Sequence, residues 1–565
     1  MKMKPKYLFN AVAALICAAS LNACYEDKSS LESISIDEVT ITANDDGVVY
    51  IGQMESLDIV PSFTQGDSKN PDGLEYEWAI TVLPDNDKEG YEIIGTDPEL
   101  HYTVSQQIDS KPYLLKLTVT DTKNDGLQYL KTWQVYVQSA FLDGLLVCDT
   151  KDDTHSDLTL VLNDKLTVHY DREERIFRNI IESTTGSPFP RKINTLFYNL
   201  RGEYTSLHIN HLWIIDENKK PGRFNLQDFS YTGIEDIMYY APEDIEFYGY
   251  SRGNMYLFCD TNNGIYGTEC QNSDALSWPL SNIPPFDNHI VGTDPIKQSN
   301  SEAVAFWLDK QNGQLFFVTG AVMSGVFYTS TITLDPQKTY PYDPNDLKGK
   351  SAIAAGLSTN GTIPSLLLKD DATGDYTIYT VTPHEPEQGH YADPDDYDSE
   401  WIIDRPEVPL APRAKFEIPA SGKALLDDAI GIFFSRMDAI LYVTKPDGIY
   451  AINFAGNNAL VESLPKYTPS DGEKITSAKL YQQGIYTSNH AACEPSLNWD
   501  EVVPPQCPML DLTNRAVIVT TQKSDTEGTV YIVPMTQIGT GNLDASKALK
   551  YDGFGKILDV TTTGY

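Results

Sequence analysis

Apolar and polar residues alternate along the first part of the chain. From Ile34 to about Gln138, apolar positions recur at every second residue, as at Leu115, Leu117 and Val119. Alternation of period two, interrupted by turn residues, indicates strands that each bury one face. About 105 residues of short strands is the size of a seven-stranded β-sandwich. We therefore predict a β-sandwich over residues 34–138.

A different pattern begins at Ser139. This part of the chain has no long helical periodicity. It repeats one unit, which consists of an apolar strand, a turn with Asp, Asn or Gly, and a second strand that often ends in an aromatic residue. Seven copies run from Met255 to Tyr266, Ile440 to Tyr450, Leu315 to Tyr328, Leu366 to Tyr379, Ala516 to Ile532, Leu145 to Val161 and Leu207 to Phe224. Repetition at a long period indicates a propeller or a solenoid. At about 60 residues per copy, residues 139–565 favour a seven-bladed β-propeller, with six or eight blades almost as acceptable.

The last apolar strand of the chain is Ile557–Val560. Radial closure of a propeller leaves no long unpaired strand edge. We predict that this strand completes the sheet of the first blade and closes the ring, so that the fold class is all-β throughout.

The first 23 residues have the pattern of a bacterial secretion signal. Three lysines end at Lys6, and an apolar run from Tyr7 to Ala19 is too short to span a bilayer as a mature helix. The following Leu21–Cys24 (LNAC) resembles the lipobox of bacterial lipoproteins, in which the cysteine is acylated and becomes the first residue. We predict lipidation at Cys24 and a tether over residues 24–33; a plain signal with a coincidental cysteine is the alternative.

Charge excludes one class of function. The chain has 80 acidic and 42 basic side chains, a formal net charge of −38. Binding to nucleic acid requires clustered Lys and Arg, which are absent from the sequence. Loss of the signal makes the mature chain more acidic still, so a membrane anchor has to be a lipid and not a basic patch.

Six cysteines remain once Cys17 leaves with the signal. In an oxidising compartment, Cys259 with Cys270 and Cys493 with Cys507 are plausible disulfides that each close a loop of about a dozen residues. Cys148 stands in an apolar run and is predicted to be an inert core thiol. None of these spacings is that of a zinc site, and we predict neither a metal nor a cofactor.

Few residues suggest catalysis. His208 and His211 are three apart in a strand-like segment, so they point to opposite faces and do not form a chelating pair. The acidic stretch Asp393–Glu400 lacks a glycine to turn around a calcium ion and is predicted to be a solvated loop in an insertion between blades. The motifs of hydride transfer, phosphoryl transfer and zinc peptidases are absent, and no catalytic residue is assigned.

Tyrosine is abundant, with 34 residues, many at strand ends or in loops. A ring with a polar tip suits sugar or peptide binding at the mouth of a propeller, although blade cores also use tyrosine heavily. The residues considered are Tyr239, Tyr240, Tyr248, Tyr250, Tyr340 and Tyr342. Paired carboxylates for glycoside hydrolysis are another possibility that an acidic sequence always offers.

Two segments of the predicted sandwich carry a family resemblance. Leu74–Trp78 (LEYEW) and Tyr113–Asp121 (YLLKLTVTD) resemble strands of PKD-type immunoglobulin-like domains, with Trp78 as a core residue. The usual Gly-Asp-Gly is replaced by Thr81–Pro84, as in the PKD-like lipoproteins of Bacteroidetes. After Cys24, the acidic Tyr25–Lys28 looks like the export signal to the outer face of the outer membrane.

The resemblance implies a role beside a SusC-like transporter and a SusD-like lipoprotein, in capture of glycans or peptides. We therefore expect a non-enzymatic, surface-exposed binding protein, held by lipid at the outer membrane. Two alternatives stay open. One is a propeller hydrolase or lyase that acts on polysaccharide, and the other is a structural scaffold of a transporter complex.

Overall fold

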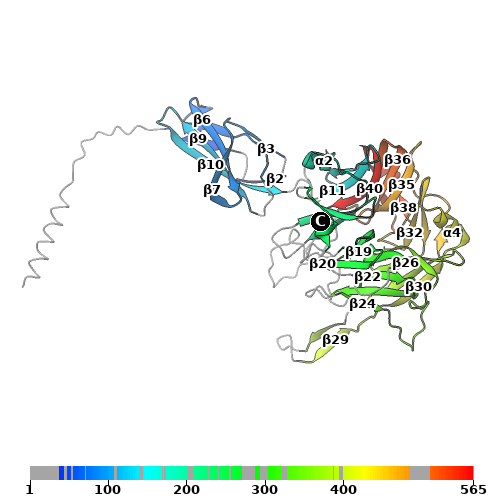
Figure 1. Ribbon diagram of the computed structural model, residues 1–565. Helices are drawn as coiled ribbons and strands as arrows, with labels where there is room; N and C mark the ends of the chain where they lie inside the picture. Colours follow the sequence, from blue (N-terminus) through cyan, green and yellow to red (C-terminus); the bar gives the residue numbers. More distant parts are fainter. Residues whose placement is uncertain are drawn as a thin grey trace, which may run out of the picture. The chain divides into compact units, whose positions relative to one another are not determined.

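The computed structural model describes residues 37–43, 47–52, 55–69, 71–106, 111–138, 144–167, 170, 173–201, 209–226, 229–238, 241–253, 256–269, 287–292, 303–320, 327–385, 387–392, 399–482 and 510–563. The chain divides into two compact units, Met1–Gln138 and Ser139–Tyr565, and both are β-structure (Figure 1). In the part described, no helix is long and apolar enough to cross a membrane.

The first unit is a sandwich of short strands. They are β1 (Val39–Thr42), β2 (Val48–Gly52), β3 (Ser56–Ile59), β4 (Ser62–Gln65), β5 (Ser68–Lys69), β6 (Leu74–Leu83), β7 (Asn86–Gly95), β8 (Leu100–Thr103), β9 (Tyr113–Asp121) and β10 (Leu127–Gln138). The main sheet has the order β2-β10-β9-β6-β7, and smaller sheets are β1-β4-β5 and β3-β8. Only β2 and β10, among the described pairs, run parallel.

Two tryptophans fill the centre of this unit, as the alternation predicts. Trp78 on β6 and Trp133 on β10 are both buried, with ring centroids 5.3 Å apart. The indole nitrogen of Trp78 donates to the carbonyl oxygen of Asp97 at 2.9 Å, which satisfies its polar atom inside the core. The core role predicted for Trp78 is confirmed.

The second unit is a ring of seven sheets within the described residues. The first contains β11 (Gly144–Thr150), β12 (Asp157–Leu162), β13 (Arg175–Phe177) and β40 (Lys556–Thr563); the second β14 (Ile193–Arg201), β15 (Ile209–Asp216), β16 (Pro221–Asn225) and β17 (Tyr231–Thr232); the third β18 (Phe247–Gly253), β19 (Tyr256–Thr261) and β20 (Gly264–Glu269); the fourth β21 (Asp287–Gly292), β22 (Ala303–Asp309), β23 (Gln314–Gly320) and β24 (Phe327–Thr331). The fifth contains β25 (Lys350–Ser358), β26 (Ile363–Asp370), β27 (Tyr376–Thr382) and β30 (Ala411–Glu417); the sixth β31 (Gly431–Phe434), β32 (Ile440–Lys445), β33 (Gly448–Asn453) and β34 (Leu460–Val461); the seventh β35 (Lys474–Leu480), β36 (Ala516–Ser524), β37 (Glu527–Thr536), β38 (Asn542–Leu543) and β39 (Leu549–Phe554). Short helices follow the first, second and fifth sheets in the chain: α2 (Ile180–Thr185), α3 (Ile234–Ile237) and α4 (Ala420–Asp427). The 3-10 turn η2 (Ala545–Lys547) lies within the seventh sheet, between β38 and β39.

The sheets follow one another around a circle. One edge strand of each sheet contacts that of the next, in the order β40, β14, β18, β21, β25, β31 and β35, and β40 also contacts β36 and β37 of the seventh sheet. Buried apolar clusters fill the seams, for example Leu146 and Leu160 against Leu212 between the first two sheets. This arrangement is a seven-bladed β-propeller, and each sheet is one blade.

The last strand of the chain closes this ring. β40 pairs antiparallel with β11, so the first blade joins residues from both ends of the unit, as Ile557–Val560 led us to predict. At the corner before β40, the Gly555 amide donates to the buried Asp149 carboxylate at 2.7 Å. A Cβ at Gly555 would collide with the carbonyl oxygen of Thr150, so this close approach requires glycine.

One side chain of β40 ties the closing strand to both neighbouring blades. Asp559 accepts hydrogen bonds from the Leu196 amide of the second blade and from Lys479 Nζ of the seventh, each at 2.7 Å. The carboxylate therefore crosses two seams at once, and it is mostly buried.

The sequence copies align with the blades, with two corrections. In six blades the copy covers the second and third strands, but in the fourth it covers β23 and β24 and misses β22. The apolar run of β22 follows residues without a clear strand pattern, so the copy was placed one strand late. The insertion that contains Asp393–Glu400 lies inside the fifth blade, between β27 and β30, and not between blades, because β30 returns to pair with β27.

We predict that Asp559→Ala lowers the free energy of unfolding by about 1–3 kcal/mol, because the Leu196 amide and Lys479 lose their common acceptor. The measurement is the urea midpoint, followed by tryptophan fluorescence. The control is Asp552→Ala, whose exposed carboxylate lies 3.7 Å from Lys550 and should change stability by less than about 0.5 kcal/mol. Equal midpoints for the two variants would contradict the role of Asp559.

Candidate functional site

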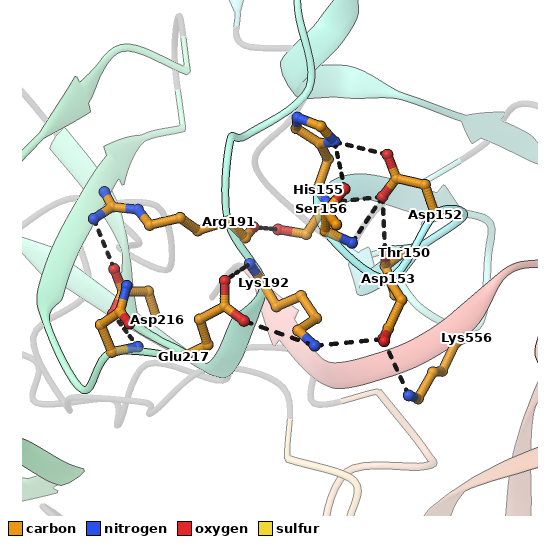
Figure 2. A network of polar contacts seen from close by, with 12 residues as sticks. Thr150, Asp152, Asp153, His155, Ser156, Arg191, Lys192, Asp216, Glu217 and Lys556 are labelled. Carbon is orange, nitrogen blue, oxygen red and sulfur yellow. Dashed lines mark hydrogen bonds and ion pairs between the residues drawn. The ribbon is translucent and has the colours of Figure 1, made fainter.

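A dense polar network lies on the ring where the first and second blades meet. Figure 2 shows side chains from the β11–β12 turn, the start of β14, the β15–β16 turn and the start of β40 converging there. Asp153 is in contact with Lys192 Nζ at 3.4 Å and Lys556 Nζ at 3.2 Å, and Lys192 also lies 3.7 Å from Glu217. These ion pairs join four separate chain segments.

Two aspartates of the network shape turns. Asp152 Oδ1 accepts from the amides of Thr154 and His155 at 2.9 and 2.8 Å, and its Oδ2 lies 2.7 Å from His155 Nδ1. These hydrogen bonds, foremost that from the His155 amide, hold the pKa of Asp152 well below its usual range. Asp216, almost fully buried, forms an ion pair with Arg191 Nη1 at 3.0 Å and accepts main-chain hydrogen bonds in its own turn.

The groups of this network neutralise one another. Opposite charges lie next to each other, and the oxygens of Asp152 accept hydrogen bonds from amides of its own turn. The arrangement holds two blades together through ion pairs between their connecting segments. We interpret it as a structural seam.

A second polar feature is the buried carboxyl of Asp260 on β19. It accepts a hydrogen bond from the indole nitrogen of Trp307 on β22 at 3.1 Å, across the seam of the third and fourth blades. Burial disfavours the charged form and raises the pKa of Asp260 to about 7, although the bond from Trp307 acts in the opposite direction.

The register of the turn places this carboxyl inside. In the third blade Thr261 pairs with Gly264 around a two-residue turn, so Asp260 falls within the ladder. In the fourth, Asp309 pairs with Gln314 around four residues and stays at the strand end, accepting from turn amides. The two segments have the same Asp-x-x-x-Gly spacing, so sequence alone could not distinguish a buried acid from a turn residue.

A third feature is a hairpin that stands out from the fifth blade. β28 (Gln388–Tyr391) and β29 (Trp401–Arg405) pair with each other and, among the described strands, with no others. In Figure 1 the label β29 marks this hairpin, extending from the ring beyond β24 and β30. All five residues of β29 are exposed, although three of them are large and apolar.

The hairpin is held in one conformation by contacts across its strands. The Trp401 indole donates to Glu387 at 3.0 Å and packs against Tyr391, with ring centroids 4.9 Å apart. A Cβ on Gly389 would collide with the Trp401 ring, so glycine makes room for it. His390 contacts Asp404 at 3.0 Å, which adds a polar link between the strands. This surface is the candidate functional site.

Two of the cysteines that the sequence singled out lie within the described residues. Cys148 is buried, and burial raises the pKa of its thiol well above the ordinary value, which confirms an inert core residue. Cys259 is buried between the second and third blades, but Cys24, Cys270, Cys493 and Cys507 lie outside the described residues. Both disulfides and the lipidation therefore stay predictions.

The histidines and tyrosines that the sequence analysis considered have structural surroundings where the structure describes them. His211 is buried on β15, His208 lies outside the described residues, and no group of three acidic, His or Cys side chains within those residues is placed to hold a metal ion. Tyr250 and Tyr342 donate to main-chain carbonyl oxygens at 2.8 and 2.9 Å, which is a structural role. The remaining tyrosines are Tyr248, bonded to Glu246 on the surface, Tyr340, near the Asp335 amide, and Tyr239 and Tyr240, outside the described residues.

Fold and comparisons together define the class: an all-β chain with a sandwich followed by a β-propeller. Residues 24–192 match the PKD-like family, so the chain carries a PKD-like family domain. The matched range includes the sandwich together with β11, β12, β13 and α2, and it ends just before β14. No curated protein matches this sequence.

Solved structures show only distant similarity. Apo AztD from Citrobacter koseri is 8% identical, with a TM-score of 0.31 over 87% of this chain and 98% of that chain. Oligogalacturonate lyase from Vibrio parahaemolyticus is 10% identical, with a TM-score of 0.33 over 77% and 96%. A crystal structure of Citrobacter koseri AztD is 9% identical, with a TM-score of 0.31 over 87% and 98%. Similarity this low carries no argument about function.

We predict that Asp260 makes stability depend on pH. The carboxyl titrates near pH 4 in the unfolded chain and near 7 in the folded one, so only the folded state holds the proton between these values. Stability from this group therefore falls as pH rises through that window. The side chain of Asp260→Asn is neutral at every pH. The free energy of unfolding of this variant, relative to that of the wild type, should therefore rise by up to about 4 kcal/mol between pH 4 and 8.

Both proteins are unfolded in urea at each pH. The contributions of all other titrating groups cancel in the difference between the two free energies of unfolding. Asp552→Asn, at an exposed position, is the control and should show no such trend. A difference between Asp260→Asn and wild type that stays constant with pH would show that the carboxyl is charged in the folded protein.

Proposed function

We propose that this chain is a lipoprotein of the outer-membrane surface that serves a SusC/SusD-type nutrient uptake system by binding, without catalysis. The observation that carries the proposal is the start of the family match. It begins at Cys24, the residue at which a lipid-bearing mature chain would begin. Removal of the signal from a lipoprotein leaves a mature chain that begins at the lipobox cysteine, and the family domain begins at the same residue.

The physical properties of the chain agree with such an anchor. With 80 acidic and 42 basic side chains, the protein is repelled by anionic lipid headgroups, so a covalent lipid has to supply the attachment. A tether over residues 24–33 separates the lipid from the sandwich, and the propeller follows. Glycans or peptides are the ligand class that we propose.

The hairpin β28–β29 favours a second function, a scaffold within a transporter complex. Exposed apolar side chains on a projecting, internally braced element are typical of contact with protein. Binding and scaffolding differ in what they retain. A binding protein is retained on a glycan or peptide array, whereas a scaffold co-elutes with the transporter from solubilised membranes and is not retained on any array.

We predict that Cys24→Ala abolishes membrane attachment. In the native cell, the wild type should incorporate a labelled fatty acid, sediment with the outer membrane and be cleaved by protease added to intact cells. The variant should incorporate no label and leave the membrane fraction, because the sequence after the signal has no apolar stretch of about 18 residues that could cross the bilayer. Cys17→Ala, within the signal, is the matched control and should behave as wild type. A variant that stays in the membrane would refute the lipid anchor.

A further inference from the structure

The hairpin β28–β29 concentrates exposed apolar surface. The exposed fractions are 42% for Trp401, 42% for Ile402, 53% for Ile403 and 37% for Val408. No other stretch of eight residues in the described chain exposes four large apolar side chains. Scattered apolar residues are ordinary on a surface, but a contiguous group on a projecting element marks a contact site.

The hairpin is also ordered before any partner arrives. The Trp401 ring is fixed by Glu387, Tyr391 and the space over Gly389. Closer to the blade, His384 lies 3.0 Å from Glu407, and the main chains of Glu385 and Val408 exchange two hydrogen bonds. Two-stranded hairpins are marginal in water by themselves, so these braces reduce the entropy that binding would otherwise cost.

The negative charge of the hairpin indicates which kind of partner can bind it. Between His384 and Val408 the described residues include five exposed acidic side chains and one arginine, and the whole chain has a net charge of −38. A second copy of this chain would bring like charges together, and an anionic membrane surface would repel the hairpin. A protein surface with an apolar groove and a basic rim complements both properties of the hairpin.

We propose that the hairpin β28–β29 docks into an apolar groove with a basic rim on another protein. Trp401 and Ile403 enter the groove, while the acidic residues around them pair with Lys and Arg of the rim. The outer edges of β28 and β29 carry main-chain groups that no described strand uses, so a strand of the partner can extend the sheet. This proposal deepens the scaffold role proposed above and rests on it.

The test uses the full chain, purified in detergent, and a phage-displayed library of random peptides. We expect selected peptides to combine Lys or Arg with aromatic or aliphatic residues. Synthetic copies should bind wild type at least tenfold more tightly than they bind the Ile403→Ser and Trp401→Ala variants, by fluorescence anisotropy. Added salt should weaken binding, because the rim contacts are between charges.

Leu464→Ser is the matched control, because Leu464 is 75% exposed elsewhere on the ring. It should bind the peptides as wild type does. Ile403→Ser keeps the backbone and the Trp401 contacts, and an unchanged unfolding midpoint excludes misfolding as the cause of weaker binding. Selected peptides that lack basic residues, or that bind Ile403→Ser as tightly as wild type, would overturn the proposal.

Two further measurements address other occupants of the surface. Sedimentation velocity should show the same monomer for wild type and Ile403→Ser; self-association lost in the variant would overturn the proposal in favour of a second copy. With Cys24→Ala introduced into both proteins, so that no lipid is attached, neither should bind vesicles of phosphatidylcholine and phosphatidylglycerol, and hairpin-dependent vesicle binding would likewise overturn the proposal. These readouts do not depend on Cys24, so their failure is distinct from failure of the anchor.

Discussion

The ring depends on the pairing of β40 with β11. Their ladder places Lys556–Thr563 beside Gly144–Thr150, and the hydrogen bond from Gly555 to Asp149 joins residues 406 apart in the sequence. Without this ladder, the first blade would expose an unpaired edge and the seventh would lose its apolar neighbour, since Val560 and Ile557 pack with Ile518 and Ile532. Contacts this distant close late in folding, because the entropy of a long loop has to be overcome first.

Polar groups on the ring mostly serve its construction. Turn carboxylates such as Asp309 and Asp370 accept amides of their own turns, and ion pairs such as Lys192 with Asp153 and Lys219 with Glu246 join one blade to the connection that follows it. Each exposed ion pair contributes little energy to folding. Some of the carboxylates that give the chain its large negative charge therefore stabilise turns.

The sequence predicted the fold better than the site. Period two identified the sandwich and the core position of Trp78, and repeated strand–turn–strand copies led to seven blades and to closure by Ile557–Val560. The candidate hairpin could not be found, because Trp401–Ile403 looks like any buried strand until the structure shows that nothing in the described residues covers it. The burial of Asp260 could not be predicted for a similar reason. Its position in the ladder depends on the length of the turn, and the spacing of Asp and Gly in the sequence does not reveal that length.

The position of β11 within its blade has a mechanical consequence. The chain enters the ring at Gly144, and β11 is bonded on one side to β12 and on the other to β40. A pull along the axis of β11 from its N-terminal end loads two antiparallel ladders in shear, so that many hydrogen bonds have to break together. An edge strand would instead peel away one bond at a time. The strand that closes the circle is thus also the one that lets the ring bear tension at its point of attachment.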